Sequence, residues 1–367
     1  MAKGGSLVQP QPVRVAIVGT GNIARIHAEA LSADVAVVAA ADVDAGRLAA
    51  FRDEFRVPAG YRDLESLLRD ARPDLVHLCT PPWLHREQAV QCLRAGVSVL
   101  VEKPPAISLR EFDEMAAAAA GPPWFATVFQ HRFGSGQRRL KALAAAGVLG
   151  RPLLAVCHTT WFRDQAYFDV PWRGQWDTEG GGPTMGHGIH QMDLLTDVLG
   201  DWAELSAVAR RQARRTVTED LSLAHVTFTS GAVASVVNSV LSPREESYLR
   251  FDFEHATVEL THLYGYGDED WRLTPAPGHE HEVLEAAELA ESGIRSGHGA
   301  QFREVVSCLR AGRQPPVAPA DSRRTLSLAA AIYASAFTRR PVTPDDLAPG
   351  TPFYTSMNGG MSLITRT

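Results

Sequence analysis

Short, nearly all-apolar runs recur through the first third of the chain, separated by amphipathic segments. The apolar runs cover residues 13–18, 35–41, 75–79 and 97–101. Runs of this length are typical of strands that are buried on both faces of a parallel sheet. The segments between them have apolar residues at helical spacing and predict helices that begin at residue 22 and cover 47–55 and 85–95. Ser108 and Glu111 form a capping box that opens one further helix.

This alternation of strands and helices predicts a Rossmann-type α/β domain with a doubly wound parallel sheet over residues 13–126. In the helix that begins at residue 22, Ile23, Ile26, His27, Ala30 and Leu31 follow helical spacing and are the expected inner face. The domain should therefore have helices on both faces of its sheet.

The pattern changes in the second half, where strands follow one another with few helices between them. After a helix over 138–146, strands are expected at 153–162, 202–210, 221–229, 232–240, 248–254 and 257–263, with a last helix over 325–337. Ser230-Gly231 between two alternating runs indicates a tight hairpin. Residues 127–367 are thus expected to form an α+β domain with an open, largely antiparallel sheet, which binds substrate and mediates oligomerisation. Val233, Val236 and Val237 give one strand two apolar faces, which fits either a subunit contact or a well-covered strand.

Bulk composition excludes several classes of protein. The 367 residues carry a formal net charge of −6 without a basic stripe, so neither nucleic acid nor an anionic membrane surface is an expected partner. No apolar run is long enough to span a membrane, and residues 1–12 read as a disordered tail rather than a secretory signal. The four cysteines are scattered without paired motifs, which favours a reducing cytoplasm.

A glycine-rich turn follows the first strand and reads Gly19-Thr20-Gly21-Asn22-Ile23-Ala24. Glycines here allow a sharp turn and let backbone N–H groups approach a pyrophosphate at the helix N-terminus. Asp42 ends the second strand at the distance where an acidic residue binds the adenosine ribose. The alternative is an ordinary structural turn. The context favours dinucleotide binding, and Asp42 favours NAD over NADP, although nearby Arg47 weakens that preference.

Two polar loops follow later strands of the same expected sheet. Thr80-Pro81 leads to His85 after one strand, and Glu102-Lys103-Pro104 follows the next. In an open parallel sheet, ligands bind beyond the carboxyl ends of the strands, so both loops should converge on one crevice. Partial burial and a nearby cation would lower the pKa of Lys103 toward neutrality and suit it to proton transfer. The simpler alternative is an exposed lysine after a strand.

Together these blocks resemble the Gfo/Idh/MocA oxidoreductase family. The resemblance rests on the glycine turn, T-P-x-x-x-H at Thr80–His85, E-K-P at Glu102–Pro104, and Gln130-His131-Arg132-Phe133, where the family has Asn for Gln130. It continues through Gly180-Gly181-Gly182 to a G-x-H-x-x-D helix at Gly188–Asp193 and covers nearly the whole chain from residue 13 to about 342. The motifs identify the family but not the substrate.

The resemblance implies roles for individual residues. Lys103 and His190 would be catalytic, with Lys103 binding the reacting hydroxyl and His190 acting as general base. The expected substrate-binding residues are Lys103, Trp161, Arg163, Arg173, His187 and His190. The expected cofactor-binding residues are Gly19, Gly21, Asn22, Ile23, Asp42, Thr80, Pro81, His85, Glu102, Lys103, Gln130, Trp172 and Arg173.

One position departs from the family pattern. Members that oxidise a sugar or inositol hydroxyl usually have D-x-x-x-H, and the Asp position is Gly186 here, whereas His190 is retained. Either His187 takes over substrate binding or Gly186 makes room for a bulkier ligand. A metal held by His187, His190 and Asp193 is conceivable, but the spacing is not that of a short zinc motif, and no metal is expected.

Aromatic residues cluster between the two expected domains. They are Trp161, Phe162, Tyr167, Phe168, Trp172 and Trp176. Such rings stack on the apolar faces of sugars, and they equally well pack on one another. The resemblance favours the ligand role, because a Trp-Arg pair before the three glycines borders the substrate site of the family.

The leading hypothesis is an NAD-dependent dehydrogenase acting on a secondary alcohol of a sugar, glycoside, inositol or carbasugar. One alternative is redox elimination on a glycoside, in which NAD is reduced only transiently. Another is a non-catalytic binding or regulatory protein, suggested by Gly186 and opposed by Lys103 and His190. A homo-oligomer, dimer or tetramer, through the second sheet is expected.

Overall fold

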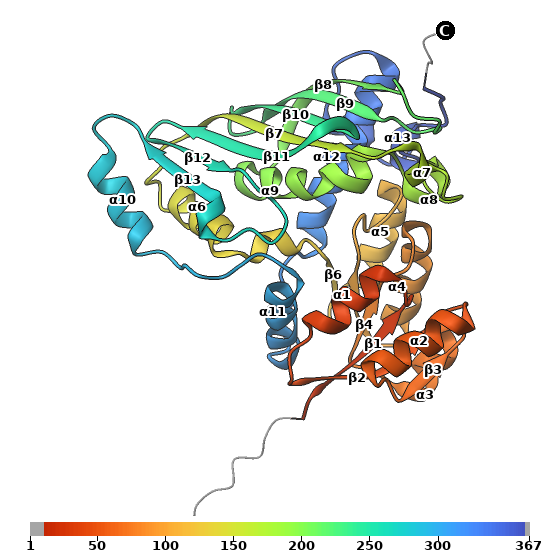
Figure 1. Ribbon diagram of the computed structural model, residues 1–367. Helices are drawn as coiled ribbons and strands as arrows, with labels where there is room; N and C mark the ends of the chain where they lie inside the picture. The colour runs from red at the N-terminus through yellow and green to blue at the C-terminus, as the bar shows by residue number, and fades with distance from the viewer. Residues whose placement is uncertain (1–10, 364–367) are drawn as a thin grey trace, which may run out of the picture.

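The computed structural model describes residues 11–363, so residues 1–10 of the expected tail lie outside it. The molecule contains two sheets (Figure 1). The first is formed by strands from the N-terminal part of the described chain, and the second by strands that come later in the sequence. Within the described range, no helix combines the length and apolar character that crossing a membrane requires.

The first sheet is parallel throughout, in the order β3-β2-β1-β4-β5-β6. Its strands are β1 (Val13–Val18), β2 (Val35–Ala41), β3 (Ala59–Tyr61), β4 (Leu75–Leu78), β5 (Ser98–Val101) and β6 (Phe125–Thr127). The helices between them are α1 (Asn22–Ala30), α2 (Ala45–Phe55), α3 (Leu64–Ala71), α4 (His85–Arg94) and α5 (Leu109–Ala118). This order reverses direction between β1 and β4, which confirms the doubly wound Rossmann-type sheet.

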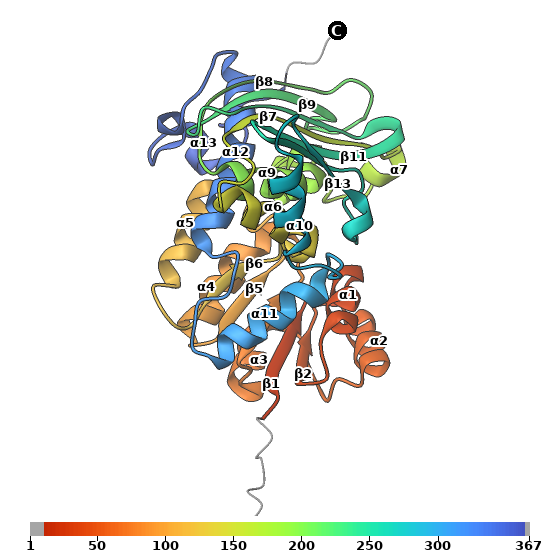
Figure 2. The same ribbon diagram turned by 90° about the vertical axis from the view of Figure 1, so that its left-hand side faces the viewer.

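Alternate residues of β1 point into two separate cores. Ala16 and Val18 pack with α3, α4 and α5, whereas Val15 and Ile17 pack with α1, α2 and α11 (His298–Arg310). Helix α11 comes after the second sheet in sequence and returns to lie against the first (Figure 2). Phe302, Val305 and Val306 are its buried contribution there. A segment from the end of the chain therefore completes the first domain.

The second sheet has the order β13-β12-β11-β7-β10-β9-β8 and is antiparallel except for the β7–β10 pair. Its strands are β7 (Pro152–Phe162), β8 (Trp202–Arg210), β9 (Leu221–Phe228), β10 (Val233–Ser239), β11 (Leu241–Phe253), β12 (Ala256–Leu260) and β13 (Trp271–Pro275). The expected hairpin joins β9 to β10, with Gly231 at φ 87°. The open, largely antiparallel sheet is thus confirmed.

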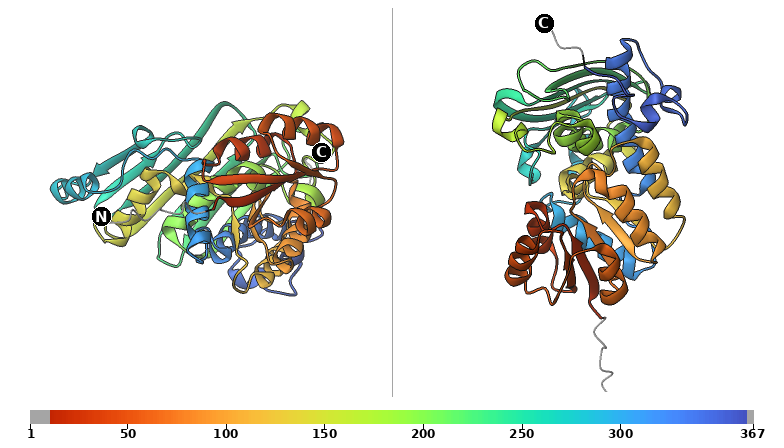
Figure 3. Two further views of the ribbon diagram at one scale, coloured as in Figure 1. Left: turned by 90° about the horizontal axis from the view of Figure 1, so that it is seen from below. Right: turned by 90° about the vertical axis from the view of Figure 1, so that its right-hand side faces the viewer.

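Helices cover one face of the second sheet, on the side toward the first domain (right panel of Figure 3). They are α6 (Ser135–Ala145), α9 (Ile189–Leu199) and α12 (Pro319–Thr338). The shorter helices are η1 (Pro82–Leu84), η2 (Gln130–Phe133), α7 (Gln165–Phe168), α8 (Trp176–Glu179), η3 (Thr184–Gly188), η4 (Asp268–Asp270), α10 (Glu280–Glu288), η5 (Pro344–Leu347) and α13 (Pro352–Thr355).

The other face of the second sheet presents apolar side chains. Leu154 on β7 is paired with Val233 on β10, and Leu223 on β9 is paired with Val208 on β8. All four are exposed. Val236 points to the covered face and is fully buried, so β10 is apolar on both sides but covered on only one.

Some local expectations were wrong. Ile26 was expected on the inner face of α1 but is 45% exposed, whereas His27 is fully buried, because α1 turns positions 24 and 27 toward the sheet. Strand β11 begins at Leu241 rather than at residue 248, and α12 begins at Pro319 rather than at 325. Elements β3, α3, β13, α10 and α11 were not anticipated. Most of these elements are short. The others have a weak hydrophobic pattern, so tertiary contacts determine their structure.

Candidate active site

The glycine turn between β1 and α1 has the geometry of an anion-binding loop. Gly19 has φ 83°, and a Cβ there would lie 2.9 Å from backbone atoms of Cys79 and Thr80. Only glycine fits this position. Gly21 is the N-cap of α1, makes no side-chain capping bond, and has open space where a Cβ would stand. The first N–H groups of α1 therefore face outward at the positive end of the helix, where a phosphate binds.

Asp42 lies at the end of β2 beside this turn. Its carboxylate accepts hydrogen bonds from Thr20 N (2.8 Å), Thr20 Oγ1 (2.9 Å) and Asp44 N (2.8 Å). Arg47 also donates to it at 3.1 Å. Burial alone would raise the pKa of Asp42, but these bonds outweigh it and lower the pKa. An ionised carboxylate at this place suits the ribose hydroxyls of NAD, and the turn and Asp42 together fit that cofactor.

The loops after β4 and β5 meet, as expected. The ring of His85 lies between them, with Nε2 2.8 Å from Thr80 O and Nδ1 3.0 Å from Pro104 O. Thr80 Oγ1 also donates to Gln88 on α4 at 2.6 Å, while Pro81 is the N-cap of η1. The loop that carries Lys103 is therefore fixed to the loop that follows β4.

Lys103 connects the first domain to the second. Its Nζ donates to the carbonyl oxygen of Gly186 at 3.0 Å. Gly186 lies in η3, a single π-helical turn before α9, and such turns are common at functional sites. Burial lowers the pKa of Lys103, and the charge of Arg173 lowers it further, while Glu102 and Glu179 act in the opposite direction. The structure thus excludes the alternative of an exposed lysine without contacts.

Two buried histidines come from the same segment as Gly186. His187 and His190 each have an Nδ1 without a hydrogen-bond partner in the part of the chain that the structure describes. Burial, and then the charge of Lys103, holds the pKa of both well below the usual value. Both imidazoles are therefore neutral at pH 7 and can accept a proton or a hydrogen bond.

Aromatic rings surround these imidazoles. The ring of His190 lies edge-on to His131 (5.0 Å between centroids) and Tyr264 (5.6 Å). The ring of His187 lies 5.2 Å from Trp161 and 5.7 Å from Tyr167. Trp161 and Tyr264 also contact each other, at 5.3 Å, so a continuous wall of rings connects the two histidines.

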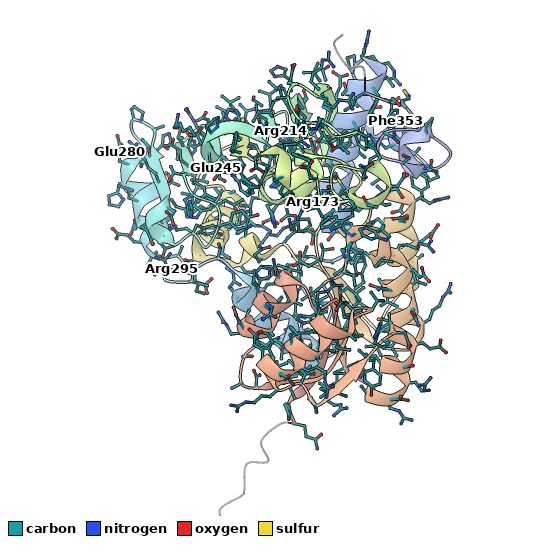
Figure 4. All side chains as sticks on the ribbon, turned by 45° about the vertical axis from the view of Figure 1, so that its right-hand side comes forward. Arg173, Arg214, Glu245, Glu280, Arg295 and Phe353 are labelled. Carbon is teal, nitrogen blue, oxygen red and sulfur yellow. The ribbon has the colours of Figure 1, made fainter. Side chains whose placement is uncertain are left out.

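Two arginines lie on this wall. Arg173 stacks on Tyr167 (4.1 Å) and on Trp172 (4.3 Å) and pairs with Glu179 at 3.3 Å. It lies on the side of the second domain that faces the first (Figure 4). Arg163 lies over Trp161 and pairs with Glu245 at 2.9 Å. The expected substrate residues of the second domain thus lie together, and the arginines among them pack on the rings of Tyr167, Trp172 and Trp161.

Asp193 and Gln130 are both buried, and neither makes a hydrogen bond to His187 or His190 within residues 11–363. Asp193 forms a two-bond ion pair with Arg132 at 2.7 and 2.6 Å, which fixes η2 to α9. Its carboxylate is therefore engaged and does not join His187 and His190 as a ligand set. Gln130 is buried in η2, and its Oε1 has no hydrogen-bond partner within residues 11–363.

Sequence reasoning missed several residues of this region. Tyr264 comes from the loop after β12, and no local pattern marks it. His131 stands in the quoted Gln130–Phe133 segment but was given no role. Glu179 was not singled out. Each of these residues is recognised as part of the site only from the fold, which brings its segment close to η3.

Comparison with known proteins agrees with this geometry. Residues 13–123 match the family described as "Oxidoreductase family, NAD-binding Rossmann fold", and residues 137–259 match the "GFO/IDH/MocA C-terminal domain". D-apiose dehydrogenase of Paraburkholderia graminis is 28% identical, over 94% of this chain and 93% of that protein. D-glucoside 3-dehydrogenase of Escherichia coli is 31% identical over 53% of this chain, and the match spans 56% of that protein.

The solved structures include a similar fold with ligands bound. The WlbA dehydrogenase from Bordetella pertussis, in complex with NADH and UDP-GlcNAcA, has a TM-score of 0.80 and 25% sequence identity. The similarity covers 92% of this chain and 99% of that one.

Proposed function

The chain belongs to the Gfo/Idh/MocA oxidoreductase family of NAD(P)-dependent dehydrogenases that act on CH–OH groups, and on that premise we propose its substrate class. The substrate is a secondary alcohol of a sugar, glycoside, inositol or carbasugar. The observation that carries the proposal is the contact of Lys103 Nζ with the Gly186 carbonyl, beside two buried imidazoles with unpaired nitrogens. Relatives named for apiose and glucoside oxidation support the same class.

Most residues that hold NAD in this proposal lie along the carboxyl ends of the first sheet, and the others come from η2 and from the second domain. The backbone of Gly19, Gly21, Asn22 and Ile23 binds the pyrophosphate, and Asp42 binds the adenosine ribose. The nicotinamide half lies against the remaining expected residues, Thr80, Pro81, His85, Glu102, Lys103, Gln130, Trp172 and Arg173. Bound NAD supplies the hydride acceptor.

The proton is handled by the chain itself. In alcohol oxidation, Lys103 donates a hydrogen bond to the reacting oxygen and stabilises the negative charge that develops on it. His190 accepts the hydroxyl proton on its imidazole ring, while the hydride leaves the same carbon for NAD and a carbonyl forms. Burial lowers the pKa of His190, so its ring is neutral before the transfer and is a weaker base than a free imidazole.

The substrate ring lies along the aromatic wall in this proposal. Trp161 offers an apolar face, while Arg163, Arg173 and His187 offer donors to hydroxyl groups. A Cβ on Gly186 would meet open space, so the position that carries a carboxylate in many relatives leaves room for ligand here.

A screen of purified protein with NAD against polyols, aldoses, glycosides and inositols, read at the NADH absorbance, tests the proposal. We expect NADH formation with members of one of these classes, and formation slower by about 10²–10⁴-fold in Lys103→Ala. Product without accumulation of NADH would instead indicate redox elimination. Binding of a sugar without product would indicate a non-catalytic role.

The apolar open face of the second sheet supports a homo-oligomer. Leu154, Val208, Leu223 and Val233 are exposed on neighbouring strands of one face. Pairing of two such faces would remove them from water. Sedimentation of the purified protein tests the oligomer.

The four cysteines are free and buried, in keeping with a cytoplasmic location.

A further inference from the structure

A buried group of polar side chains lies directly behind Lys103. Glu102 is its centre, with His27 from α1 and His298 from the start of α11 on the same carboxylate oxygen. His27 Nε2 lies 2.9 Å from Glu102 Oε1, and His298 Nε2 lies 3.6 Å from it. On the far side, His27 Nδ1 lies 3.0 Å from His77 Nδ1 and 3.3 Å from Cys79 Sγ. The function described so far uses Glu102 only as a contact of the nicotinamide half and gives the histidines and the cysteine no role.

Hydrogen-bond partners fix the charges. Burial alone would raise the pKa of Glu102, but the hydrogen bond from His27 and the nearby ring of His298 hold it well below the usual value. Burial lowers the pKa of His27 and of His77, so both rings are neutral. His27 then donates from Nε2 to Glu102 and accepts at Nδ1 from His77. The negative charge of Glu102 is therefore buried next to Lys103 in the chain.

A metal ion is the competing explanation. The ligand atoms of His27, Glu102 and His298 lie within 4.8 Å of one another. However, 2.9 Å between His27 Nε2 and Glu102 Oε1 is a hydrogen-bond distance, and two ligands on one tetrahedral zinc ion would stand about 3.3 Å apart. The geometry favours the hydrogen bond.

Glu102 also acts on its neighbour in the chain. Its second oxygen, Oε2, accepts a hydrogen bond from the backbone N–H of Lys103 at 3.0 Å. The same carboxylate thus orients the Lys103 backbone and places a negative charge one residue from the ammonium. Burial and Arg173 favour the neutral amine of Lys103, and the Glu102 charge opposes both.

We propose that the Glu102 carboxylate, held by His27 and His298, is a positioning residue that keeps Lys103 in its charged form at the active site. Because His298 belongs to α11, the segment that returns after the second sheet contributes to this control. The proposal rests on the role of Lys103 proposed above. The other titratable groups near the two side chains are His77, Cys79, His85, His131, Arg173, Glu179, His187, His190 and Tyr264.

The composition of the chain allows a direct test. The sequence has only three lysines, Lys3, Lys103 and Lys141, so NMR of lysine labelled with ¹³C and ¹⁵N gives few signals to assign. In ligand-free full-length protein, we expect Glu102→Gln to lower the pKa of Lys103 by about one unit or more, because the opposing charge is lost. Lys141, which pairs with Asp197, is the internal control and should not shift.

A conservative variant separates charge from packing. Glu102→Asp keeps the charge in a shorter side chain and should leave the pKa of Lys103 closer to wild type than the isosteric Glu102→Gln does. A purely structural role predicts the reverse order, with the isosteric variant the milder one. His298→Gln should lower the pKa of Lys103 as Glu102→Gln does, but by less. This variant replaces Glu102→Gln as the test if Glu102→Gln fails to fold. His281→Gln, at an exposed histidine of α10, is the matched control for that variant.

Kinetics give a second readout. Lys103 must be protonated to donate its charged hydrogen bond, so activity is lost as pH rises through its pKa. Glu102→Gln should move this alkaline limb of kcat to lower pH, as measured at NAD concentrations that saturate the variant. A Lys103 pKa that is unchanged in Glu102→Gln would overturn the proposal. One equivalent of zinc in the purified protein would also overturn it. The titration needs no substrate, so its failure is distinguishable from a wrong substrate class.

Discussion

The two ends of the expected cofactor site are built in different ways. At the adenosine end, Gly19, Gly21 and Asp42 all come from one strand-helix-strand unit, and their geometry follows from local backbone conformation and hydrogen bonds. At the reactive end, Lys103, Gly186 and His190 come from two domains and touch only because the chain folds back. The first end should therefore control cofactor affinity, and the second should control the rate of the chemical step.

The largest effect is expected at His190. His190→Ala should reduce kcat by about 10⁴-fold, because it removes the group that accepts the hydroxyl proton. The KM for NAD should stay near wild type, since the adenosine end is untouched. Steady-state kinetics with saturating NAD measure this, and full activity of the variant would remove His190 from the mechanism.

Two glycine variants separate the fold from cofactor binding at the adenosine end. Gly19→Ala should lower the free energy of unfolding by about 1–3 kcal/mol, because a Cβ would collide with the Cys79–Thr80 backbone at φ 83°. Gly21→Ala, with open space at its Cβ, should leave thermal stability unchanged but weaken NAD binding about tenfold by crowding the pyrophosphate. Thermal melting and calorimetric titration with NAD measure the pair. Equal melting temperatures for both variants would contradict this account.

A smaller change is expected at Asp42. Asp42→Ala should bring the dissociation constants of NAD and NADP within about threefold, because the carboxylate that repels a 2′-phosphate is gone and Arg47 is released to bind one. A wild-type protein that binds NADP more tightly than NAD would show that Arg47, not Asp42, sets the preference.

The smallest effects concern the position where the chain departs from its family. His187→Ala should raise KM for the sugar several-fold with little change in kcat, because it removes a positioning contact. Gly186→Asp should not improve turnover, because a carboxylate would occupy open space that ligand fills. Faster turnover in Gly186→Asp would show that the glycine lowers activity and does not make room for the ligand.

The same contrast explains how far the sequence could be used for prediction. The Rossmann sheet, the glycine turn and Asp42 follow from periodicity and short-range spacing, and β1, β2 and β8 were predicted to the residue. The ring wall was visible only in part, because Tyr264 and His131 acquire partners through tertiary packing. His27 was expected on the inner face of its helix, but nothing local predicts its bond to Glu102, and His298 lies far along the chain from Glu102. A carboxylate held by two such histidines has no local signature.

The central claim is that Lys103 acts mainly on the chemical step, whereas the adenosine end of the site controls most of the affinity for NAD. Single-turnover oxidation of a substrate by Lys103→Ala, at NAD and substrate concentrations that saturate the variant, tests it most directly. We expect the rate to fall by about 10²–10⁴-fold while the dissociation constant of NAD changes less than about threefold. A single-turnover rate near that of wild type would contradict the account and place Lys103 outside the reacting centre.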